Sequence, residues 1–234
     1  MTKIIGISGK KQSGKNTVAN YINGYILQSR GMIQDFTITK DGELKILTSN
    51  NSGHTDWGIF DVTRKDEAFI NYAESELWPY VKIYHFADYL KQICVELFDL
   101  TPKQVYGTDD DKNTDTPYGM TSREFLQYFG TNVMRKIKDT IWVDYTIKTI
   151  KYEQSSLSII PDVRFPNEVH AIKDAGGIII RLNRDVHSPQ HECEKALDED
   201  VFDWSEFDYV IDNQNISVKD LCIKLRKFTN LWSI

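Results

Sequence analysis

The sequence has few cysteines and no long apolar run, and these absences restrict the class of protein. Its three cysteines, Cys94, Cys193 and Cys222, are widely spaced and form no Cys-x-x-Cys motif, so we expect reduced thiols. No apolar stretch approaches the ~20 residues that span a bilayer, and the run in "MTKIIGISGKK" is too short for the apolar segment of a signal peptide. We therefore expect a cytoplasmic protein without a membrane partner.

An excess of positive charge is also missing. The formal net charge is −6 and the pI is near 5.4, which argues against nucleic acid as the main partner. The composition, with 41% hydrophobic and 26% charged residues, is that of an ordinary globular chain rather than a disordered or fibrous one. We find no internal repeat. A length of 234 residues suits one α/β domain that carries an inserted segment.

Five short apolar runs predict the strands of a sheet, and stretches with helical spacing separate them. The runs cover residues 3–8, 81–86, 157–165, 177–182 and 207–212. Alternating strands and helices favour an α/β fold with a mainly parallel five-stranded sheet flanked by helices. We expect residues 1–234 to form a single domain.

Residues 31–80 depart from this alternation. Asp41-Gly42 predicts a type I′ turn that places Lys40 opposite Glu43. The following "TSNNSGHTDWG" is loop-like in composition. We interpret 31–80 as an insertion that contains a β-hairpin.

Two further segments are rich in polar residues. Residues 107–119 are acidic and turn-rich, which predicts an exposed loop. Residues 181–199, which begin in a predicted strand, are polar and rich in charge. This predicts a lid, over 184–206, that closes on a phosphate through Arg181 or Arg184. His187, His191 and Cys193 lie in this region, but their spacing fits no common zinc site.

Helix starts are marked by specific residues. Thr121 with Glu124 and Ser217 with Asp220 have the spacing of capping boxes. Pro166 is well placed in the first turn of a helix.

The stretch from Gly9 to Lys15 has the GxxxxGK spacing of a Walker A loop. Its glycines let backbone N–H groups turn toward phosphate oxygens, and the following helix adds its positive N-terminal end. Lys15 would bridge the terminal phosphates. The alternative is a tight strand-to-helix turn with surface lysines. The loop departs from the usual pattern at Asn16, so that either Asn16 or Thr17 would lie near Mg²⁺.

A second candidate for a functional site is the stretch "IIPDVRFPNE". Asp162 falls at the carboxyl end of a predicted strand, where open α/β sheets bind ligands, and it could hold a metal ion or its water. Arg164 projects from the same edge and could bind a phosphate through its planar fork; the two could instead form a surface ion pair. Basic residues on the middle helices are either ligand contacts or solvated charges: Lys91, Arg123, Arg135 and Lys136.

Six motifs, in this order, resemble those of the bacteriophage deoxynucleoside monophosphate kinases, members of the P-loop kinase superfamily. They are "SGKKQSGKNTVA", "FADYLKQ", "SREFLQYFGTNVMR", "IWVDY", "IIPDVRFPNE" and "HECEKALD". They span most of the chain except 31–80 and 107–119. Because that family commonly has a non-hydroxyl residue between the lysine and the threonine, "GKNT" looks like a family variant, with Asn16 in place of the family's acidic residue.

The resemblance implies a P-loop nucleoside monophosphate kinase fold and transfer of the ATP γ-phosphoryl group to the 5′-phosphate of a deoxynucleoside monophosphate, with Mg²⁺. It also implies a homodimer and a role in phage nucleotide synthesis in the host cytoplasm. The implied ATP site comprises Gly9, Lys11, Gln12, Ser13, Gly14, Lys15, Asn16, Thr17 and Arg184.

The implied monophosphate site comprises Lys11, Leu90, Lys91, Arg123, Gly130, Thr131, Trp142, Asp162, Arg164 and Glu168. Of the residues in the two sites, Lys15, Arg123, Asp162 and Arg164 are the expected catalytic groups, and Thr17 and Asp162 the expected metal ligands. Trp142 would either stack on the base or fill the core. Glu168 would either bind the base or sugar or place a favourable charge in the first turn of a helix.

Three other functions fit parts of the sequence. A kinase with another acceptor, similar to dephospho-coenzyme A kinases, would share the loop and the lid. A nucleotide-binding switch or ATPase is disfavoured because Asp162-Val163 stands where many ATPases have Asp-Glu. A binding module with an inactive loop would fail to bind ATP. The sequence does not indicate which bases are accepted, because base recognition depends on the shape of the pocket.

Overall fold

The computed structural model describes residues 2–49, 53–184 and 195–233. The chain forms two compact units. The first comprises Met1–Tyr84 with Ile150–Ile234, and the second comprises His85–Thr149.

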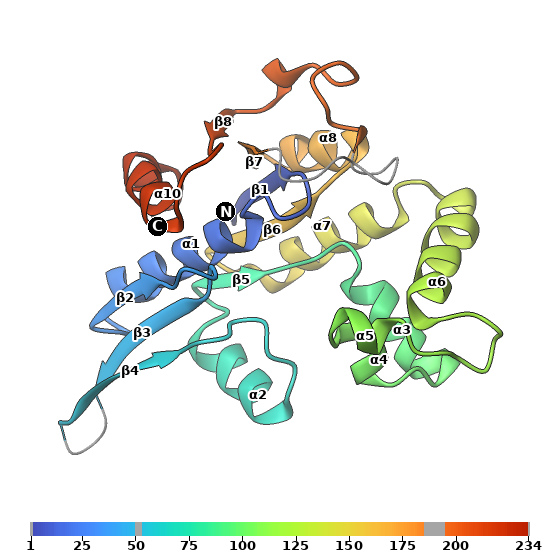
Figure 1. Cartoon of the computed structure of the whole chain (residues 1–234), viewed down its shortest axis with the longest axis horizontal. Helices are drawn as coiled ribbons and strands as arrows, with labels where there is room; N and C mark the ends of the chain where they lie inside the picture. The colour runs from blue at the N-terminus through green and yellow to red at the C-terminus, as the bar shows by residue number, and fades with distance from the viewer. Residues whose placement is uncertain (1, 50–52, 185–194, 234) are drawn as a thin grey trace. The chain divides into compact units, whose positions relative to one another are not determined.

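The first unit is built on a parallel sheet (Figure 1) with the strand order β5-β6-β1-β7-β8. All five expected strands are present, which confirms the predicted α/β fold class. The strands are β1 (Lys3–Gly9), β5 (Val81–Ile83), β6 (Leu157–Val163), β7 (Ile178–Asn183) and β8 (Tyr209–Asp212).

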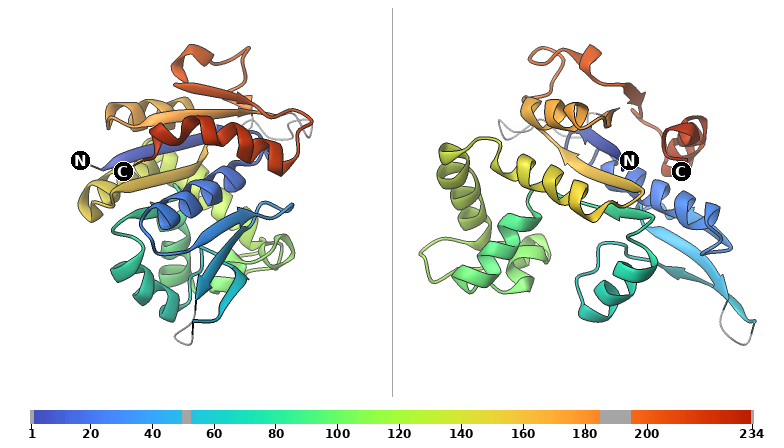
Figure 2. Two further views of the ribbon diagram at one scale, coloured as in Figure 1. Left: turned by 90° about the vertical axis from the view of Figure 1, so that its left-hand side faces the viewer. Right: turned by 180° about the vertical axis from the view of Figure 1, so that it is seen from behind.

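The two faces of the sheet bury different helices because side chains alternate along each strand. On β1, Ile5 belongs to the same buried cluster as the apolar residues of α1 (Lys15–Ser29). Gly6 faces the other way, where a Cβ atom would lie 2.9 Å from Ile172 of α8 (Pro166–Asp174). Figure 2 shows α1 and α8 on opposite sides of the sheet. Both faces of the sheet are therefore covered.

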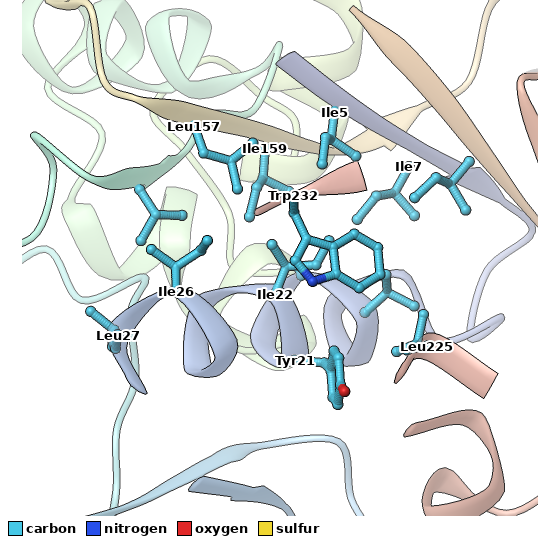
Figure 3. Close-up of a cluster of buried hydrophobic side chains, with 14 of the residues drawn as sticks. Ile5, Ile7, Tyr21, Ile22, Ile26, Leu27, Leu157, Ile159, Leu225 and Trp232 are labelled. Carbon is cyan, nitrogen blue, oxygen red and sulfur yellow. The ribbon is translucent and has the colours of Figure 1, made fainter. Parts of the chain in front are cut away.

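The main core lies between the sheet and α1, and the C-terminal segment closes it. This segment consists of α10 (Val218–Leu225), the 3₁₀ segment η3 (Arg226–Leu231) and Trp232. The Trp232 side chain is fully buried, and its ring centroid lies 6.3 Å from that of Tyr21 on α1. Figure 3 shows the indole ring among the aliphatic side chains of α1 and the sheet.

The 31–80 segment forms a second, antiparallel sheet in the order β2-β3-β4, followed by a helix. Its elements are β2 (Asp35–Ile38), β3 (Leu44–Ser49), β4 (Thr55–Ile59) and α2 (Glu67–Glu76). The expected hairpin is therefore present. The assignment of "TSNNSGHTDWG" to a loop is wrong, because β3 extends to Ser49 and β4 begins at Thr55. Thr55–Ile59 is exposed on both faces, so it has no apolar alternation by which a strand could be recognised.

The turn between β2 and β3 is longer than expected. The Thr39 N–H donates to the Glu43 carbonyl (2.9 Å), and the Gly42 N–H donates to the Thr39 carbonyl (3.0 Å). Gly42 has a φ of +86°, but Asp41 does not have a positive φ. A type I′ turn requires positive φ at both positions. The type I′ prediction is therefore wrong, and Thr39 rather than Lys40 opposes Glu43.

The second unit is helical. It contains α3 (Asp88–Phe98), α4 (Pro102–Tyr106), α5 (Asp109–Lys112), α6 (Ser122–Gln127), the π-helix η1 (Tyr128–Arg135) and most of α7 (Ile141–Glu153). The prediction that 107–119 is one exposed loop is wrong in part, because Thr108 and Asp111 form a capping box that starts the short helix α5.

The predicted helix caps are confirmed. Thr121 accepts a hydrogen bond from the Glu124 N–H, and Ser217 accepts one from the Asp220 N–H. Pro166 occupies the first turn of α8. Within the described ranges, no helix has the length and apolarity required to cross a membrane.

We expect Trp232→Ala to lower the free energy of unfolding by about 3–5 kcal/mol, the usual cost of removing a buried aromatic side chain. Chemical denaturation monitored by circular dichroism measures this change. Tyr152→Ala is the control, because its ring is 87% exposed and its loss is expected to change stability by no more than about 0.5 kcal/mol. Equal effects of the two substitutions would contradict the assignment of Trp232 to the core.

Candidate functional site

The loop Gly9–Thr17, which we call the phosphate-binding loop, connects β1 to α1 as the motif requires. Gly14 precedes the helix with a φ of +97°, which favours glycine. A Cβ atom on Gly9 would lie 2.3 Å from Ser13 Oγ, so the loop also needs glycine there. The loop therefore leads directly into the positive N-terminal end of α1, which is the geometry of an anion site.

The ammonium group of Lys15 folds back over this loop. Its Nζ donates to the carbonyl oxygens of Gly9 and Lys10, both at 2.7 Å. Of the other loop residues predicted to bind ATP, Lys11, Gln12 and Asn16 are exposed. Ser13 is buried, and its carbonyl accepts a hydrogen bond from Asn213 Nδ2 at 2.7 Å. Buried contacts thus hold the loop from the side of the protein interior, while most of its polar side chains are exposed to solvent.

Thr17 differs from Asn16 in its surroundings. Asn16 is exposed, but Thr17 is only 8% exposed. The Oγ1 atom of Thr17 lies 2.4 Å from the position that a Cβ atom on Gly42 would occupy. The Thr17 hydroxyl therefore faces the turn between β2 and β3.

Arg181 forms a buried polar contact beside the loop. Its side chain on β7 is 5% exposed, and its Nη1 donates to Ser8 Oγ at 2.9 Å. Its Nη2 lies 3.5 Å from Asp198 Oδ1, and Asp198 Oδ2 lies 3.5 Å from Lys10 Nζ. The guanidinium also lies 5.1 Å from the ring centroid of Trp204. Arg181 is therefore a buried strand residue, and the prediction that it could belong to a lid is wrong.

A cavity of about 290 Å³ adjoins this network, and its lining includes Lys10, Arg184, Asp198 and Trp204. Arg184 and the loop residue Lys10 thus line the same cavity. Residues 185–194 of the predicted lid, which include His187, His191 and Cys193, lie outside the described residues.

Asp162 lies next to the strand that carries the phosphate-binding loop. The parallel pairing of β1 with β6 passes from Gly6 opposite Ile160 to Ser8 opposite Val163, so that β6 contains one extra residue at Pro161-Asp162. Proline is tolerated at such a bulge because it has no N–H to donate to the ladder. Bulges frequently redirect a side chain beside an active site. Asp162 is partly buried near the carboxyl end of β6.

Arg164 and Glu168 follow directly. The Arg164 side chain is exposed, whereas Glu168 is 2% exposed. Glu168 Oε2 accepts hydrogen bonds from the backbone N–H groups of Arg164 (2.7 Å) and Phe165 (3.1 Å). This geometry favours the helix-start interpretation of Glu168, in which its carboxylate fixes the backbone that carries Arg164.

In the second unit, Trp142 is also an internal residue. It is 4% exposed, and its Nε1 donates to the Gly130 carbonyl at 3.0 Å. Gly130 is a close-packed position, since a Cβ atom there would lie 2.5 Å from Leu90. These contacts favour the core interpretation of Trp142. Thr131 is exposed on the same π-helix.

Two of the four basic candidates of this unit, Arg123 and Lys91, contact other side chains within it. Arg123 donates through Nη2 to Asp109 Oδ1 (2.8 Å) and through Nε to Asn113 Oδ1 (3.1 Å). Lys91 Nζ lies 5.0 Å from the ring centroid of Tyr106. Burial, together with the Asp88 carboxylate, raises the pKa of Tyr106 to about 12, so the phenol beside Lys91 is neutral.

Two of the cysteines are free thiols, Cys94 and Cys222, as expected. Burial raises the pKa of Cys94 to about 11 and also raises that of Cys222. Neither has the depressed pKa of a reactive thiol.

We expect Glu168→Ala to lower the free energy of unfolding by about 1–3 kcal/mol, because two backbone N–H groups would lose their acceptor. Denaturant titration measures the effect. Glu67→Ala is the matched control, since Glu67 also lies in the first turn of a helix but is exposed. A loss no larger than that of Glu67→Ala would contradict the structural role of Glu168.

Residues 84–225 match the profile of the family described as deoxynucleotide monophosphate kinase. A protein of Acanthamoeba polyphaga mimivirus, whose name assigns it to the deoxynucleotide monophosphate kinases, is 34% identical over 139 residues. These residues cover 50% of this chain and 70% of that protein. The length of the first match and the coverage of the second show that the chain belongs to the deoxynucleotide monophosphate kinase family.

Proposed function

We propose that this kinase transfers the γ-phosphoryl group of ATP, in line, to the 5′-phosphate of a deoxynucleoside monophosphate. The observation that carries the proposal is the phosphate-binding loop, which lies outside the family match at 84–225 and thus supports a donor site independently of it. The acceptor-side candidates, with the exception of Lys11, lie inside that match. Apart from Lys11 and Arg184, the proposed donor and acceptor contacts thus lie in different parts of the chain.

On the donor side, the N-terminal end of α1 and the loop would hold the phosphates of ATP. Lys15 would exchange its bonds to the Gly9 and Lys10 carbonyls for bonds to the terminal phosphates. Because its ammonium already lies over the loop, this exchange requires only a short movement of a flexible side chain. Gly9, Lys11, Gln12, Ser13, Gly14, Asn16 and Arg184 complete the proposed ATP site.

On the acceptor side, Arg164 would bind phosphate oxygens, because its guanidinium is exposed while its backbone is fixed by Glu168. Lys91 and Arg123 would supply further positive charge. Trp142 would act through packing, by holding Gly130 and the π-helix in place. Leu90, Thr131 and Lys11 are the other proposed contacts of the monophosphate.

The attacking atom is an anionic phosphate oxygen, so the reaction needs no strong general base. Catalysis would then consist of alignment and of neutralising the negative charge that accumulates when two phosphates approach each other. Lys15 and Arg164 would neutralise this charge from the donor and acceptor sides. Arg123 would hold the acceptor.

The residues fit a magnesium ion that is held mostly by phosphate and water. Within residues 2–49, 53–184 and 195–233, no group of three His, Cys, Asp or Glu side chains could form an all-protein site. Mg²⁺ in kinases typically uses one or two protein oxygens together with phosphates. Asp162 is the favoured ligand, because the Thr17 hydroxyl faces Gly42. Bound Mg²⁺ would reduce the negative charge of ATP.

The family assignment decides against the other functions considered from the sequence. A dephospho-coenzyme A kinase, a nucleotide-dependent switch and an inactive binding module are not what the family description names. The homodimer and a phage origin remain predictions from the resemblance.

A coupled ADP-release assay tests the proposal with ATP, Mg²⁺ and each of dGMP, dTMP, dCMP, dAMP and their ribose counterparts. We expect turnover with at least one deoxy acceptor and a loss of about 10²-fold or more in Lys15→Ala, since a preorganised charge contact is removed. Lys219→Ala is the control, because Lys219 is an exposed lysine on α10. No turnover with any acceptor, despite ATP binding, would refute the proposal.

Arg164→Ala is expected to lower turnover by roughly 10³- to 10⁵-fold, as the loss of other transition-state arginines does. Its thermal stability is expected to be unchanged because the side chain is exposed. Arg64→Ala, which removes another exposed arginine, provides the control. Near wild-type turnover of Arg164→Ala would exclude Arg164 from the mechanism.

A further inference from the structure

The hairpin of the 31–80 segment lies along α1, the helix that follows the phosphate-binding loop (Figure 1). In the second turn of α1, close to the loop, Asn20 Nδ2 donates to the Gly42 carbonyl at 2.9 Å. At the far end, Gln28 Nε2 donates to Asp35 Oδ1 at 3.0 Å. Side-chain amides of both halves of the helix therefore form hydrogen bonds with the hairpin.

Two glycines allow this close approach. A Cβ atom on Gly24 of α1 would lie 2.3 Å from Phe36 of β2, and one on Gly42 of the turn would lie 2.4 Å from Thr17 Oγ1. Gly42 is buried although it lies at the tip of a hairpin. A turn residue that is buried against the first turn of α1 leaves little space for Thr17 to move.

The first turn of α1 is part of the phosphate-binding loop. Val18 donates from its backbone N–H to the Gly14 carbonyl at 3.0 Å, which closes the turn that contains Lys15 and Thr17. The contacts of the Gly42 backbone with Thr17 and Asn20 therefore restrain the turns of α1 that lead out of the loop, where N–H groups would face phosphate.

We propose that the turn Thr39–Glu43 is a positioning element of the nucleotide site. Gly42 and Asn20 are positioning residues that hold the first two turns of α1, and Thr17 is the residue against which Gly42 packs. The insertion therefore contributes to the affinity for the phosphoryl donor without contacting it. This inference rests on the proposed function, because it assumes that ATP binds at the loop.

The experiment compares Asn20→Ala with Gln28→Ala by isothermal titration calorimetry with ATP and Mg²⁺ in the absence of acceptor. Asn20→Ala removes one side-chain hydrogen bond between α1 and the 31–80 segment, and Gln28→Ala removes two, to Asp35 Oδ1 and to the Gln34 carbonyl, but only Asn20 lies near the loop. We expect Asn20→Ala to weaken ATP binding by roughly 2- to 30-fold, the usual range for coupling through neighbouring residues. Gln28→Ala is expected to bind ATP like the wild type.

A second pair tests the close contact. Gly42→Ala places a methyl group against Thr17, whereas Gly31→Ala introduces a similar positive-φ strain (+70°) with no atom within 4 Å. We expect Gly42→Ala to raise the KM for ATP by about tenfold or more, as overpacking in a close-packed site suggests. Two further measurements separate positioning from a general loss of stability. If Gly42 has a positioning role, Gly42→Ala leaves the KM for the monophosphate unchanged and has a melting temperature similar to that of Gly31→Ala.

The outcomes distinguish this inference from the proposed function. If the wild type does not bind ATP, both are overturned. If the wild type binds ATP and Asn20→Ala binds it equally well, the positioning role is overturned and the proposed function stands. Should Gly42→Ala fail to fold, the comparison of Asn20→Ala with Gln28→Ala still decides the question, because neither of these adds an atom.

Discussion

Helix α1 is enclosed by protein along most of its length, and the other elements of the first unit are arranged around it. The parallel sheet covers one side, the β2–β3 hairpin another, and α10 with Trp232 a third. Its buried residues include polar and glycine positions, such as Asn23 and Gly24, as well as the aliphatic ones. A helix enclosed in this way has little freedom to tilt. Its N-terminal end, where phosphate would bind, is therefore fixed by hydrophobic burial rather than by the ligand.

Besides hydrophobic burial, buried polar contacts hold the loops and strand ends at the edge of the sheet where the candidate site lies. Arg181 bridges Ser8 and Asp198, Asn213 holds the Ser13 carbonyl, and Glu168 holds the backbone of Arg164. Each contact joins a strand end or loop to a neighbouring segment. Because an unpaired polar group is costly in a buried site, such contacts restrict the loops to one arrangement. A candidate substrate-binding side chain such as Arg164 can then be exposed while its backbone stays in place.

Much of the fold could be predicted from the sequence, because its signals are local. Apolar runs located the five strands, and the GxxxxGK spacing and the Thr121 and Ser217 caps located the loop and two helix starts. Strand β4 and the length of the β2–β3 turn could not be predicted, since an exposed edge strand has no apolar pattern and tertiary contact with α1 shapes the turn. The burial of Trp142 and Glu168 also depends on distant residues. Arg181 did give a signal, as a charged residue inside the apolar run "GIIIRL".

The central position of β1 has a consequence for how the protein reaches its folded state. Lys3 pairs with Leu157 on one side, and Ile5 pairs with Ile178 on the other. The strand that leads into the phosphate-binding loop therefore acquires both neighbours only through contacts of very large sequence separation. Such pairings are slow to form, and until they do both edges of an apolar strand are open to other chains. We therefore expect the proposed nucleotide site to fold late, and the partly folded chain to be the state most exposed to aggregation.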